Sequence, residues 1–176
     1  MAEYYDIRVK LIDVQPELWR RIQIKRTATF QDLHDAIQDS CSWENRHLFS
    51  FLSGAPYQSP EIAKLSADGD VPAARNLKLK DYFANQNNCT YLYDFGDDWV
   101  HEISCETITL GDRFKRRLVG GCGSFPPEDC GGIYGFERCL DVLEGKEEDT
   151  DNLKEWLGDW RPNNFSLDDL KIVFDQ

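Results

Sequence analysis

Residues 4–25 read YYDIRVKLIDVQPELWRRIQIK and carry two runs of alternating polarity on either side of a turn. In residues 4–12 every second position is apolar, at Tyr5, Ile7, Val9 and Leu11. Residues 18–25 repeat the pattern, with Ile22 and Ile24 on the inner side. Alternation of this kind is typical of a half-buried strand. Because the turn at residues 13–17 is short, the two predicted strands pair as an antiparallel hairpin.

A helix and a third strand are predicted directly after this hairpin. Thr29 can cap the helix with Asp32 as its capping-box partner, and apolar residues recur at helical spacing from Phe30 to Cys41. The third strand is predicted at residues 47–52. The order strand, strand, helix, strand resembles the start of a β-grasp fold. We therefore predict an α+β fold, with a mostly antiparallel sheet and helices packed on one face.

The remainder of the chain alternates between loops and short elements, and no linker divides residues 1–176, which we expect to form a single domain. The predicted order is a loop-rich stretch at 53–88 with a short helix at 79–84, strands at 89–95 and 99–110, a basic run at 113–117, a Gly/Pro-rich loop at 120–132, and helices from about 133 to 145, from 150 to 157 and from 166 onward.

Composition limits the functions that need to be considered. The net charge is -12, which repels a phosphate backbone and makes nucleic acid an improbable partner. No apolar run reaches the roughly 20 residues that span a bilayer, and residues 1–5 do not resemble a signal peptide. We therefore expect a cytoplasmic protein without a membrane partner. Its six cysteines form no Cys-x-x-Cys pair, so we expect reduced thiols, no zinc knuckle and no cofactor.

The first candidate site is the predicted hairpin turn Tyr93-Asp94-Phe95-Gly96-Asp97-Asp98-Trp99-Val100-His101. Strand alternation places Trp99 and His101 on the same inner face. An inward histidine must be hydrogen-bonded or functional, and Asp94, Asp97 or Asp98 could reach it across the turn. The alternative is a core histidine whose hydrogen bonds are satisfied by a neighbouring carboxylate or carbonyl.

The second candidate is the segment Pro126-Pro127-Glu128-Asp129-Cys130-Gly131-Gly132, called the PPED loop below. Its prolines and glycines hold Glu128 and Asp129 on a restrained backbone, as a binding or catalytic site requires. A tight structural turn, in which one of these carboxylates caps the next helix, explains the pattern equally well. Glycines next to acids do not make a phosphate loop.

Further sites can be drawn from these and neighbouring residues. Trp19 and Arg20 could recognise an anion or a peptide, although a strand-edge Trp covered by a loop is as good an explanation. A nucleophilic Cys130 activated by His101 is another possibility. A metal site could be assembled, without diagnostic spacing, from His101, Asp97, Glu128, Asp129, Cys122 and Cys130.

The same residues resemble the plasmid pRi open-reading-frame-three-like protein family over nearly the whole chain. The motifs that carry the resemblance are Pro16-x-Leu18-Trp19-Arg20-Arg21, Leu33-His34, Ile37-Gln38, Trp43, His47-Leu48, Phe51, Tyr93-Asp94-Phe95-Gly96-Asp97-x-Trp99-x-His101-x-Ile103 and Pro126-Pro127-Glu128-Asp129-Cys130-Gly131-Gly132-x-x-Gly135. The resemblance implies no particular activity. Some members are labelled TnpR-type resolvases, but the acidic final third of this chain lacks the basic tail that such an enzyme needs. Phe125 stands where members often have a cysteine, which weakens a metal site built on that thiol.

Three functions follow as hypotheses. The first is a non-catalytic binding or adaptor module that presents the hairpin turn and the PPED loop to a protein or small molecule. The alternative is a metal-dependent or His/carboxylate hydrolase that uses His101 with Asp97, Glu128 or Asp129. The weakest is a mobile-element DNA recombination protein. The first two require the hairpin turn and the PPED loop to meet at a solvent-reachable site.

Overall fold

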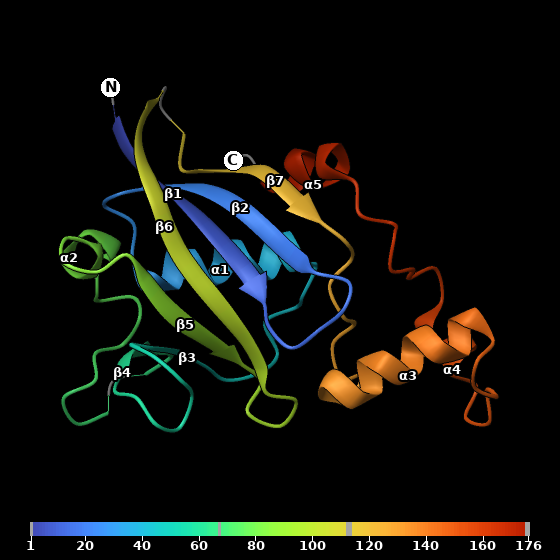
Figure 1. Cartoon of the computed structure of the whole chain (residues 1–176). Helices are drawn as coiled ribbons and strands as arrows, with labels where there is room; N and C mark the ends of the chain where they lie inside the picture. Colours follow the sequence, from blue (N-terminus) through green and yellow to red (C-terminus); the bar gives the residue numbers. More distant parts are fainter. Residues whose placement is uncertain (1, 67, 112–113, 175–176) are drawn as a thin grey trace.

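The computed structural model of this chain describes residues 2–66, 68–111 and 114–174, and its centre is a seven-stranded sheet (Figure 1). The strands are β1 Ala2–Leu11, β2 Leu18–Lys25, β3 Phe49–Leu52, β4 Glu61–Lys64, β5 Asn88–Tyr93, β6 Trp99–Gly111 and β7 Arg116–Cys122. They lie in the order β4-β3-β5-β6-β1-β2-β7, and every pairing between these strands is antiparallel. The predicted α+β class with a mostly antiparallel sheet is confirmed.

The first hairpin forms as predicted, with Tyr5 opposite Ile24 and Leu11 opposite Leu18. Its alternation produces the expected burial, because the apolar positions of β1 and β2 are almost fully buried. The other edge of β1 pairs with β6, so the first strand of the chain lies inside the sheet.

The helices are α1 Phe30–Cys41, α2 Leu79–Phe83, α3 Gly132–Glu144, α4 Leu153–Leu157 and α5 Leu167–Phe174. The predicted capping box is present, because Asp32 N donates to the Thr29 hydroxyl and Thr29 N donates to the Asp32 carboxylate. Helix α1 buries its apolar side against one face of the sheet, and α5 contacts both α1 and β7. Helices α3 and α4 pack on each other beside one end of the sheet (Figure 1).

Strands β4 and β7 were not predicted. β4 is a four-residue strand at the edge of the sheet that pairs with β3 and forms one further bridge from Lys64 to Ala73. It is too short for alternation to stand out in a loop-rich stretch. β7 covers part of the predicted basic run and of the Gly-rich loop, and it pairs with β2 despite Gly120 and Gly121. Of the basic run, Arg113 lies outside the described residues. No described helix has both the length and the apolar character that crossing a membrane requires.

Arg20 is a charged residue in the core, with only 2% of its surface exposed. Its guanidinium donates hydrogen bonds to the backbone carbonyls of Ser40 at 2.7 Å, Trp19 at 2.8 Å, Cys122 at 3.1 Å and Gly123 at 2.9 Å. Its guanidinium carbon also lies over the rings of Phe125 and Phe165, at 4.5 Å and 4.1 Å from the ring centroids. No salt bridge joins it to any described residue, and burial lowers the pKa of Arg20 to about 10.

We expect the substitution Arg20→Lys to destabilise the protein by about 3 kcal/mol or more, because a lysine cannot satisfy four separated carbonyl groups and would bury an unpaired ammonium. Urea unfolding followed by circular dichroism measures the loss. Arg117→Lys, at an exposed position of β7, is the control and should cost less than about 1 kcal/mol. Similar losses in both variants would contradict the role assigned to Arg20.

Candidate functional site

The hairpin turn and the PPED loop meet in the folded protein. Gly131 N donates a hydrogen bond of 3.2 Å to Asp97 Oδ2, and Gly132 lies against the carbonyl of the same aspartate. The hydroxyl of Tyr93 donates to Glu128 of the loop. Residues more than thirty positions apart in the sequence are therefore held in one place, as the hypotheses require.

Asp94 organises the hairpin turn through one of its two carboxylate oxygens. Oδ1 accepts hydrogen bonds from Gly96 N at 2.9 Å and from Asp97 N at 3.4 Å. Asp94 and Asp98 have positive φ angles of 58° and 54°, which non-glycine residues seldom adopt. The restrained turn leaves Oδ2 of Asp94 directed away from it, toward the segment that precedes β3.

Glu128 ties the PPED loop to that same segment. One of its oxygens accepts from the Tyr93 hydroxyl and the other accepts from Glu44 N at 2.7 Å. The Tyr93 hydroxyl in turn accepts from Arg46 N at 3.1 Å. Burial, and then the adjacent Glu128 carboxylate, raise the pKa of Tyr93, so the hydroxyl stays protonated and remains a donor. Glu128 is therefore bonded on both oxygens, and it positions its neighbour Asp129.

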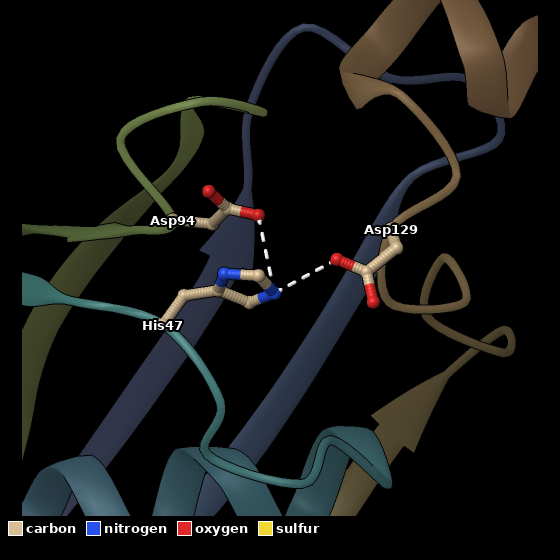
Figure 2. A group of neighbouring side chains, drawn as sticks. All are labelled: His47, Asp94 and Asp129. Carbon is tan, nitrogen blue, oxygen red and sulfur yellow. Dashed lines mark ion pairs between the residues drawn. The ribbon is translucent and has the colours of Figure 1, made fainter.

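His47, Asp94 and Asp129 form the centre of the site, each from a different segment (Figure 2). His47 Nε2 lies 3.6 Å from Asp94 Oδ2 and 2.9 Å from Asp129 Oδ1. The shorter distance would allow a hydrogen bond, but Nε2 is a buried atom that makes no aligned hydrogen bond with either carboxylate. The side chains are 28%, 12% and 53% exposed, so solvent reaches the site from the Asp129 side. One ligand-type atom from each residue lies within 4.8 Å of the others.

His101 points inward as predicted, and of the two alternatives the structure shows the core histidine next to a carbonyl, not the contact with an aspartate of the turn. The imidazole is fully buried, its Nδ1 lies 3.2 Å from the Tyr91 carbonyl, and its Nε2 has no hydrogen-bond partner. The rings of Trp43 and Phe125 lie beside it. Burial lowers the pKa of His101 to about 4. It is a core residue that cannot reach a substrate.

Several other predicted site residues lie apart from this centre. Trp99 is buried beneath the turn. Trp19 and Arg20 point to opposite faces of β2, and because Arg20 is buried the two do not form a joint recognition surface. Cys122 is exposed at the end of β7.

A hydrogen bond to Cys139 and burial raise the pKa of Cys130, so it is a poor nucleophile. His47 was missed as a site residue because it was assigned to the start of a strand, whereas β3 begins at Phe49.

Comparisons with known proteins agree with this architecture. A family model described as plasmid pRiA4b ORF-3-like protein matches residues 3–169. The uncharacterized protein y4hQ of Sinorhizobium fredii (strain NBRC 101917 / NGR234) is 30% identical over 162 residues, which cover 90% of this chain and 82% of that protein. The crystal structure of MM3350 from Methanosarcina mazei Go1, a protein of unknown function, matches with a TM-score of 0.83 and 32% identity over 96% of this chain and 97% of that one.

The burial of His101 predicts a loss of stability in mild acid. Below pH 6.5 the unfolded chain takes up a proton at this imidazole, whereas the folded protein resists protonation until about pH 4. The stability present above pH 6.5 is therefore lost as the pH falls toward 4, by about 3 kcal/mol at most. Urea unfolding at pH 7, 5.5 and 4.5 should show a smaller loss in His101→Phe than in the wild type. An identical pH dependence would contradict this prediction.

A substitution at Gly132 tests how closely the PPED loop packs against the hairpin turn. It has φ +67°, and an added Cβ would lie 2.7 Å from the Asp97 carbonyl oxygen. Gly145, with φ +75° and nothing within 4 Å of an added Cβ, is a matched control. Both alanine variants carry backbone strain of about 1 kcal/mol, and we expect Gly132→Ala to cost at least about 1 kcal/mol more. Equal free energies of unfolding for the two variants would show that the close approach does not matter.

Proposed function

The chain belongs to the plasmid pRiA4b ORF-3-like family, and we propose that it is a binding module whose binding surface lies where the hairpin turn and the PPED loop meet. We call this the joint surface and define it as residues 46–48, 57, 94–98 and 128–132. The observation that carries the proposal is the convergence of the two motifs on one solvent-reachable site through Gly131, Glu128 and Asp129.

Exposed apolar side chains on the joint surface support a binding role. Leu48, Tyr57 and Phe95 are 55%, 72% and 43% exposed. Each is fixed to the turn, because the Leu48 carbonyl accepts from Asp94 N at 2.9 Å, the Tyr57 hydroxyl donates to Asp98, and Phe95 belongs to the turn itself. Apolar groups that a rigid backbone holds in water beside charged groups are typical of protein-binding surfaces. The partner that fits is a protein or peptide segment with an apolar side chain.

The hydrolase alternative built on His101 or Cys130 receives less support from these contacts. Its assigned base, His101, has no exposed surface. Cys130 carries a raised pKa, and His101, the base proposed to activate it, is fully buried in the core. The recombination hypothesis is not supported either, because the net charge of -12 opposes binding to DNA.

A random peptide library displayed on phage and selected against the immobilised protein tests the binding module. We expect enriched peptides to bind the wild type and to lose at least about tenfold in affinity toward the double variant Leu48→Ser/Phe95→Ser, because the apolar contacts on the joint surface are removed. Trp156→Ser is the control, since Trp156 is 51% exposed but belongs to α4.

Fluorescence anisotropy of labelled peptides measures the three affinities. Peptides that bind all three proteins equally, or a library from which nothing is enriched, would overturn the proposed function. Thermal melting of the double variant shows whether it remains folded.

A further inference from the structure

We infer that His47, Asp94 and Asp129 bind one divalent transition-metal ion. This inference rests on the proposed function, because it names a ligand of the joint surface. It replaces the metal site drawn from the sequence, since Asp129 alone belongs to both sets. His101 lies in the core and Glu128 has hydrogen bonds on both carboxylate oxygens.

The donor atoms suit such an ion. An imidazole nitrogen with two carboxylate oxygens is a ligand set used for zinc, manganese and iron. Ligands about 2.1 Å from a tetrahedral ion lie about 3.4 Å from one another. The distances from His47 Nε2 to the aspartate oxygens, 3.6 Å and 2.9 Å, bracket that value. Small movements of the exposed Asp129 side chain would therefore complete the geometry.

The bonding state of His47 favours an ion over a simple ion pair. Its Nε2 atom is buried and has no aligned hydrogen bond, although two carboxylates lie beside it. A buried nitrogen without a hydrogen bond is costly, and a metal ion would use its lone pair. The two aspartates also repel each other, and the guanidinium of Arg46, with Nη1 3.9 Å from Asp129 Oδ2, already pairs with Glu44. A divalent cation balances both carboxylates.

The surroundings hold the ligands as a metal site requires. The backbone N–H groups of Gly96 and Asp97 fix Oδ1 of Asp94 and thereby orient Oδ2. Glu128, bonded to Tyr93 and Glu44, places Asp129 beside His47. Three protein ligands leave coordination positions open, as in metal sites that bind a further group. An oxygen donor of the bound partner can occupy the open side near Asp129.

Calorimetric titration of EDTA-treated protein with MnCl2 and with ZnCl2 tests this inference. We expect one ion to bind per chain, and binding at least about 100-fold weaker in Asp129→Asn, since a direct ligand is removed. His47→Gln should show the same loss. Asp70→Asn, at an exposed position outside the joint surface, is the control and should bind as the wild type does. Cys139→Ser, outside the joint surface, should also retain the site, which excludes the Cys130–Cys139 thiol pair as the source of zinc binding.

Asp129 is half exposed and, among the described residues, its ion pairs are with His47 and Arg46, so Asp129→Asn should fold, as thermal melting would show. Absence of binding in the wild type, or equal affinity in Asp129→Asn and Asp70→Asn, would overturn the metal site. That result would leave the peptide binding of the joint surface untouched. Conversely, metal binding without selection of any peptide would uphold the site and reject the binding module.

Discussion

The fold depends on a buried positive charge that backbone oxygen atoms stabilise in place of an acid. Arg20 joins the last turn of α1, its own strand β2 and the chain that leaves β7. A carbonyl at a helix C-terminus carries partial negative charge, so Ser40 O is a favourable partner for the guanidinium. The ring of Phe125 packs on the guanidinium, which fixes the residue that directly precedes the PPED loop. The position of that loop therefore depends on the core of the protein.

Two tryptophans extend this anchoring toward the site. Trp43 Nε1 donates to the Pro126 carbonyl at 2.8 Å, and Trp160 Nε1 donates to the Phe125 carbonyl at 3.0 Å. Each indole is an apolar group with one donor, and each uses that donor to hold the backbone in front of Glu128. The loop is thus rigid from its first residue, and the orientation of Asp129 follows from these contacts and from Glu128 together.

Much of the fold could be predicted from the sequence, because local patterns determine it. The alternation in residues 4–25 and the Thr29–Asp32 capping box identify β1, β2 and α1. β4 and β7 could not be found in this way. β4 is short and β7 contains two glycines, and both are stabilised as strands by pairing with a neighbouring strand, which a local pattern does not reveal. The convergence of the two motifs was predicted, but its histidine was not. The alternation of β6 correctly predicted that His101 points inward, but this position belongs to the core and not to the site. His47 lies two residues before β3, so no strand or helix periodicity indicates where its side chain points.

The place of β1 inside the sheet affects the order in which the protein can be assembled. Its partner β2 follows after a short turn, but its other neighbour, β6, ends about a hundred residues later in the chain. Synthesis proceeds at about 5–20 residues per second, so this edge of β1 stays unpaired for several seconds on the ribosome. An apolar strand with an open edge can pair with a neighbouring nascent chain.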